Sequence, residues 1–153
     1  MSVPPRTVCA MAIGIQVVFD AADPEKLSEF WAVALDYESQ PPPPGFDTWQ
    51  DFAAKLGMPE EEWHSRAALI DPDGAKPRIF FQRVPEPKVA KNRVHLDINV
   101  SVGAPDKEEG WRRVTAHTER LVAAGATVLR ELNEPAGHCM VMQDPEGNEF
   151  CVQ

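Results

Sequence analysis

Apolar positions along the chain predict two similar runs, each a strand, a helix and three further strands. In the first half, the β-branched stretch at residues 13–21 predicts a strand. A helix should follow, because apolar side chains recur with helical spacing from Leu27 to Ala34, behind the N-cap candidate Asp23. Three more strands are predicted at residues 37–40, 65–70 and 78–83.

The second half repeats this order. Residues 93–102 predict a strand and residues 106–125 a helix, which ends at Gly125, where a left-handed residue is favoured. Three further strands are predicted at residues 127–131, 138–143 and 148–152. The helix side chains expected to face the core are Trp111, Val114, Leu121 and Val122.

Two matching turns support an internal repeat. Asp71 begins the turn "DPDG" and Asp144 begins the turn "DPEGN", and each turn precedes the last strand of its half. The fold class is therefore α+β, with two tandem βαβββ modules forming a curved mixed sheet around a cleft. We expect a flexible tail at residues 1–10 and a single domain at 11–153. Within it, module one covers about 11–84 and module two about 93–153, and an insertion at residues 45–64 should form a short helix and a turn.

Composition excludes two classes of partner. The net charge of −9 argues against nucleic acid, whose binding requires clustered Lys and Arg. No apolar run approaches the ~20 residues of a membrane span. The three cysteines have no CxxC spacing, which favours reduced thiols and a cytoplasmic location.

Three phrases carry a family resemblance: "FDAADPEKLSEFWAVAL", "RVPEPKVAKNRVHLDI" and "VMQDPEGNEFCV". Together they resemble the vicinal oxygen chelate superfamily, which includes glyoxalase I, extradiol dioxygenases and bleomycin-resistance proteins, and in particular its glyoxalase-like branch. The resemblance implies a U-shaped cleft, a homodimer and a small organic ligand. In metal enzymes of this family, the first and last strands of each module supply the metal ligands.

Carried over to this sequence, the family's ligand positions fall on Gln16, Phe80, His95 and Cys151. This set has no carboxylate and includes a side chain without a donor atom, so we expect no physiological metal. A divalent metal held by Gln16, His95 and Cys151 is the alternative.

Strand alternation gives a second view of the cleft. In module two it places His95, Asp97, Glu149 and Cys151 on the cleft face. In module one it places Ile15, Val17 and Phe19 toward the helix and leaves Gln16, Val18, Phe80 and Gln82 for the cleft.

Each candidate has two interpretations. His95 and Glu149 form either a catalytic acid–base pair or a structural one. Asp97 either binds ligand or pairs with a nearby arginine, the options being Arg78, Arg83 and Arg93. Cys151 is either a nucleophile activated by His95 or a small buried apolar residue.

Trp49 and Trp63 lie in the insertion. They either cover a flat ligand in the cleft or anchor the insertion itself.

The sequence thus predicts a glyoxalase-like small-molecule-binding protein without the family's catalytic metal. The alternative is a lyase, isomerase or dioxygenase of the vicinal oxygen chelate type. Such an enzyme would depend on a metal or use the His95 and Glu149 pair.

Overall fold

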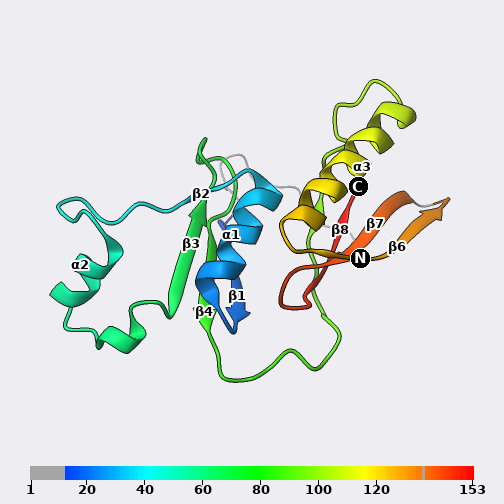
Figure 1. Ribbon diagram of the computed structural model, residues 1–153. Helices are drawn as coiled ribbons and strands as arrows, with labels where there is room; N and C mark the ends of the chain where they lie inside the picture. Colours follow the sequence, from blue (N-terminus) through cyan, green and yellow to red (C-terminus); the bar gives the residue numbers. More distant parts are fainter. Residues whose placement is uncertain (1–12, 136) are drawn as a thin grey trace, which may run out of the picture.

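The computed structural model describes residues 13–135 and 137–153. The predicted tail at residues 1–10 lies outside this range. The protein consists of two βαβββ modules joined by a long crossover, which passes below both of them in Figure 1. The predicted α+β fold class is confirmed. No helix in the described part of the chain is long and apolar enough to cross a membrane.

Module one contains a four-stranded mixed sheet with strand order β1-β4-β3-β2, in which β1 and β4 are parallel. An insertion between β2 and β3 carries α2 and η1 and extends beyond the sheet, on the left of Figure 1. The elements are β1 (Val17–Ala21), α1 (Pro24–Leu35), β2 (Glu38–Ser39), α2 (Trp49–Lys55), η1 (Glu60–Glu62), β3 (Arg66–Ile70) and β4 (Ile79–Arg83).

Module two repeats this topology without the insertion. Its sheet has the order β5-β8-β7-β6, and β5 runs parallel to β8. The elements are β5 (Asp97–Ile98), α3 (Lys107–Ala123), β6 (Thr127–Glu134), β7 (Gly137–Gln143) and β8 (Glu149–Val152).

Helix α1 forms where the sequence predicts it. The Asp23 side chain caps it by accepting a hydrogen bond from the Lys26 backbone N–H at 3.2 Å. The predicted apolar face of α1 is buried. The helix ends at Asp36, whose φ of 53° is a left-handed conformation that Asp tolerates better than most residues.

One hydrophobic core serves both modules. Trp31 of α1 packs edge-on against Phe150 of β8, with ring centroids 5.3 Å apart, and Phe30 lies 5.9 Å from the same ring. All three side chains are almost fully buried. Separating the modules would therefore expose the centre of the core to water.

The turn at residues 144–148 fastens module two to module one. The Asp144 carboxylate accepts a hydrogen bond from the Trp31 indole N–H at 3.1 Å, in a buried position. The Glu146 carboxylate accepts two more, from the backbone N–H groups of Ala22 and Asp23, each at 2.8 Å. Since these amides precede α1, the negative charge also lies at the favourable end of that helix dipole.

Three apolar side chains lie differently from the prediction. Ile15 and Val94 are 73% and 79% exposed, because both precede the strands that were expected to include them. Val122 of α3 is 47% exposed, because Val114, Thr118 and Leu121 already fill the buried face of that helix.

Strand β5 is much shorter than predicted because a side chain replaces its first backbone partner. The Cys151 N–H donates to the Leu96 carbonyl at 3.0 Å, as a parallel ladder requires. One step earlier, the Glu149 N–H donates instead to the Asn92 side-chain oxygen at 3.3 Å. The chain before Leu96 is thereby released from the sheet.

Candidate functional site

Three of the predicted cleft residues meet on the open face of the module-two sheet. His95 Nε2 lies 3.3 Å from Asp97 Oδ1. The nearest ligand atoms of His95, Asp97 and Cys151 all lie within 4.8 Å of one another. Strand pairing explains this grouping, since Asp97 is directly opposite Cys151. Asp97 therefore pairs with His95, and the expected arginine partners, Arg78, Arg83 and Arg93, are not used.

The thiol of Cys151 is poorly suited to nucleophilic attack. Burial raises its pKa to about 12, and the neighbouring Cys139 and Asp97 add to the shift. A thiolate is the reactive form, so the ground state at neutral pH is an inert thiol. The geometry favours the reading of Cys151 as a small, half-buried apolar residue.

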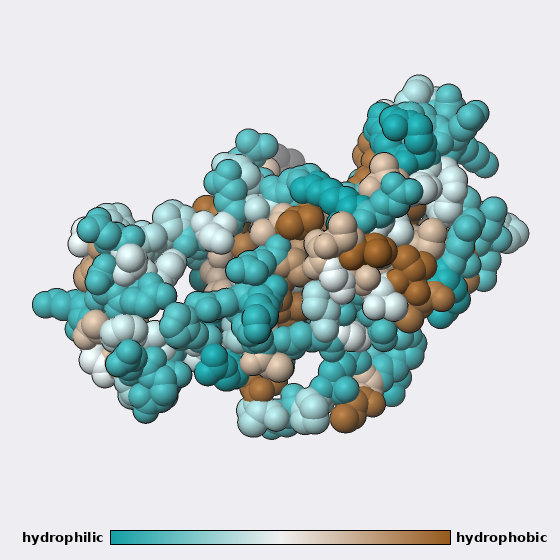
Figure 2. Space-filling view, viewed as in Figure 1, coloured by the Kyte–Doolittle hydropathy of each residue, from teal (hydrophilic) through white to brown (hydrophobic). Residues whose placement is uncertain are grey.

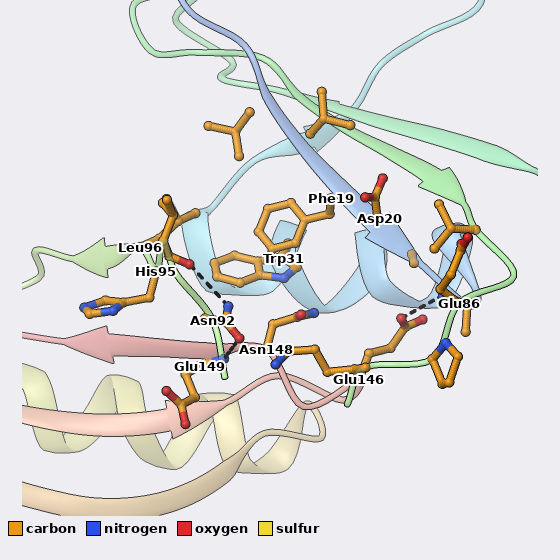
Figure 3. A pocket seen from close by; sticks show the side chains of 18 residues that line it. Phe19, Asp20, Trp31, Glu86, Asn92, His95, Leu96, Glu146, Asn148 and Glu149 are labelled. Atoms are coloured by element: carbon orange, nitrogen blue, oxygen red, sulfur yellow. Dashed lines mark hydrogen bonds between the residues drawn. The ribbon is translucent and has the colours of Figure 1, made fainter. Parts of the chain in front are cut away.

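Glu149 lies at the edge of the same face but has a different partner. Its carboxylate pairs with Lys91 of the crossover, which lowers the pKa of Glu149. His95 and Glu149 both line a pocket of about 780 Å³ between the modules. In Figure 3 the His95 imidazole and the Glu149 carboxylate both point away from the Trp31 indole, which lies beside the Phe19 ring.

Other polar residues of this inter-module pocket were missed by the sequence reasoning. Asp20 lies one alternation beyond Val18 on β1, so the period-two pattern contained a signal for it. Glu86 and Asn92 come from the crossover, where no periodic pattern exists to indicate which way a side chain points. Asn148 belongs to the turn at residues 144–148, for which the sequence predicts a structural role and no role in binding.

In module one, the cleft residues surround Arg78. Its guanidinium donates to the side-chain oxygens of Gln40 at 2.6 Å and Gln16 at 2.7 Å. It also lies over the Phe80 ring, 5.0 Å from the centroid. Gln82 donates to Asp20 at 2.8 Å, across the parallel pair β1 and β4.

Trp49, Trp63 and Phe80 line a second pocket, of about 630 Å³, between the insertion and module one. This insertion pocket shares no lining residue with the inter-module pocket. Of the predicted ligand-binding residues, only these three aromatic side chains line either pocket. Gln16, Gln82, Asp97 and Cys151 line neither of the two.

The family model for the glyoxalase-like domain matches residues 16–153, and the chain belongs to this family. It is thus a member of the vicinal oxygen chelate superfamily. Among curated protein sequences, none matches the chain.

Solved structures share the fold at low sequence identity. The genomically encoded fosfomycin resistance protein FosX from Listeria monocytogenes is 15% identical, with 94% of this chain and 91% of that chain covered and a TM-score of 0.60. A possible glyoxalase from Bacillus cereus is 17% identical, with 93% and 99% covered and a TM-score of 0.57. A glyoxalase/bleomycin resistance protein/dioxygenase family enzyme from Burkholderia phytofirmans is 14% identical, with 90% and 93% covered and a TM-score of 0.53.

The family's metal does not fit the four positions that correspond to its ligands. Phe80 has no donor atom, and the Gln16 side-chain oxygen already accepts a hydrogen bond from Arg78. Cys151 could bind as a thiolate, since a coordinated metal deprotonates a thiol. His95 and Cys151 are the two ligands that remain among these four positions, fewer than the three protein ligands of a catalytic zinc site.

Proposed function

We propose that this protein binds a small organic molecule in the inter-module pocket and does so without the family's catalytic metal. The observation that carries the proposal is the pocket itself. Its volume of about 780 Å³ lies in the range typical of small-ligand sites. Apolar rings line it together with polar side chains, among them Asn92, His95 and Glu149, which is the combination that such sites use.

A thermal-shift screen with a library of metabolites and antibiotics tests this proposal. A ligand that binds only the folded protein raises the melting temperature by mass action, by an amount that grows with ligand concentration. The shift should shrink in His95→Ala and Glu149→Gln, and it should persist in the matched variants His138→Ala and Glu119→Gln, whose side chains lie outside the pocket. A library in which no compound shifts the wild type would contradict the proposal.

The second candidate function is an enzyme of the vicinal oxygen chelate type. One observation favours it: His95, Asp97 and Cys151 bring three ligand atoms within 4.8 Å, with Asp97 standing in for the missing carboxylate. Elemental analysis of purified protein decides between the two candidates. Stoichiometric Zn, Fe, Mn or Ni that disappears in His95→Ala would replace the metal-free proposal with this one.

We also propose that the protein forms a homodimer. Support comes from apolar side chains left in contact with water, including Ile13, Ile15 and Val89, which do not line the inter-module pocket. Sedimentation should give twice the chain mass for the wild type, and Ile15→Lys should shift the equilibrium toward the monomer. A wild type that sediments as a monomer at 0.1 mM would exclude this part. We further propose a cytoplasmic location, supported by the free thiols of Cys139 and Cys151.

A further inference from the structure

The insertion pocket is a built feature of module one, separate from the proposed inter-module site. Residues of α2 and η1 form one wall, and residues of β3 and α1 form most of the other. With a volume of about 630 Å³ it can enclose a drug-sized molecule.

Aromatic rings of this pocket are held in fixed positions. The Trp49 indole N–H donates to the Gln40 carbonyl at 2.8 Å, and the Trp63 indole N–H donates to the Met58 carbonyl at 3.1 Å. Phe52 packs edge-on against Trp49, with centroids 5.9 Å apart. Because both indole N–H groups are already satisfied, these rings can offer a ligand their π-faces and not a hydrogen bond.

The charges around the pocket are mainly negative. Glu25, Glu29 and Glu62 line it, against Arg66 and Arg78. Arg78 is already engaged by two glutamine oxygens and by the Phe80 ring.

The insertion adds to this negative field. Residues 41–65 contain five Asp or Glu and one Lys. Figure 2 shows the insertion, on the left, as a mostly hydrophilic surface. Acidic groups around a cleft with apolar walls raise the local concentration of cations.

We propose that the insertion pocket binds a planar organic cation, which stacks on Trp49 and Trp63 and places its charge near Glu29 and Glu62. Indole faces attract cations more strongly than other aromatic side chains do, and carboxylates at the rim neutralise the charge that remains. The protein already contains one such pair, in which the Arg78 guanidinium lies over the Phe80 ring. A planar anion would meet three carboxylates against two arginines, a lining of net negative charge that disfavours it.

Calorimetric titration with matched tricyclic probes tests the cation preference. We expect 9-aminoacridine, a cation at pH 7.5, to bind, and anthracene-9-carboxylate to bind at least tenfold more weakly. Raising the salt concentration should weaken the binding of the cation. Equal binding of the two probes, tighter binding of the anion, or no binding of the cation would overturn the proposal.

Paired variants locate the site. Glu29→Gln/Glu62→Gln and Trp49→Leu should each weaken 9-aminoacridine binding by roughly three- to tenfold. The control Glu60→Gln/Glu61→Gln removes the same net charge from residues that do not line the pocket, and its affinity should stay within about twofold of wild type. Far-UV circular dichroism confirms that each variant folds. Equal weakening by both double variants would show attraction by net charge alone and would overturn the assigned site.

The two proposals fail independently. A library compound whose binding depends on His95 but not on Trp49 supports the inter-module site and says nothing against the cation pocket. The reverse result, with 9-aminoacridine binding lost in Trp49→Leu and no library compound sensitive to His95→Ala, supports the cation pocket alone.

Discussion

Glu146 of module two accepts a hydrogen bond from the backbone N–H of Asp23 in module one, at 2.8 Å. Asp23 is the N-cap of α1, so a side chain of one module completes the start of a helix in the other. The glyoxalase-like turn motif thus has a mechanical role in holding the inter-module pocket together, because Ala22 and Glu146 both line that pocket.

Shortening Glu146 should loosen this junction. Glu146→Asp keeps the charge but withdraws the carboxylate by one methylene, so the two hydrogen bonds are lost. We expect the free energy of unfolding to fall by about 1–3 kcal/mol. Urea denaturation measures the change, with Glu119→Asp on the exposed side of α3 as the control. A Glu146→Asp variant as stable as wild type would show that the two bonds contribute nothing net.

Trp31→Phe should destabilise the protein in two ways, because it removes a buried hydrogen bond and also reduces the packing of the core. Burial raises the pKa of Asp144, because a charged carboxylate is less stable away from water. The hydrogen bond from the Trp31 N–H is one of the contacts that stabilise the charged form. We expect a loss of about 2–4 kcal/mol in thermal or urea unfolding. Trp111→Phe is the comparison, because the half-buried Trp111 ring stacks on His138 near the surface; its loss should be clearly smaller.

Acid should weaken α3 through Glu109. Arg112 and Arg113 lower the pKa of Glu109 from 4.5 to about 2. A lowered pKa in the folded state stabilises the protein above pH 4.5, and that contribution disappears as the pH falls toward 2. The stability difference between wild type and Glu109→Gln should therefore be largest above pH 4.5 and vanish near pH 2.

Urea unfolding at pH 6, 4, 3 and 2.5 checks this prediction. Glu108→Gln serves as the control, because Glu108 shares the first turn of α3 and forms no ion pair within the described residues. A difference that is constant with pH would contradict the assignment to Glu109.

Cys151 should resist alkylation in the folded protein. With a pKa of about 12, roughly one thiol in 10⁴ is ionised at pH 8. Iodoacetamide should label Cys151 far more slowly in the native state than in urea, as followed by peptide mass spectrometry. Asp97→Asn removes a neighbouring negative charge and should speed the native reaction, while burial keeps it slower than in urea. Native labelling as fast as unfolded labelling would contradict this account.

Periodicity predicted the elements best where one face is fully buried. Helix α1 and strand β8 match their predictions because Trp31, Phe150 and Val152 repeat with the correct spacing and are all buried. Strand β5 was predicted too long, because its apolar alternation continues through Val94 although the Asn92 side chain ends the ladder. The apolar pattern of a sequence does not show where a side chain takes the place of a backbone group as a hydrogen-bond partner.

The site was predictable only within each sheet. Alternation groups His95, Asp97 and Cys151, and their nearest ligand atoms lie within 4.8 Å of one another, because Asp97 is paired with Cys151 between β5 and β8 and His95 lies just before β5. The ion-pair partner of Glu149 is Lys91 in the crossover. The path of a loop cannot be predicted from the spacing of apolar residues. For the same reason, the meeting of the insertion with Phe80 in a second pocket emerged only from the three-dimensional structure.

The turn that begins at Asp71 and the turn that begins at Asp144 make different hydrogen bonds and have different structural roles. In module one, the Asp71 carboxylate accepts hydrogen bonds from backbone amides of its own loop, and the residue two places on is Asp73. In module two that place is taken by Glu146, whose extra methylene lets the carboxylate reach the other half of the protein. The first turn thus folds its own loop, whereas the second also joins the two halves of a duplicated architecture.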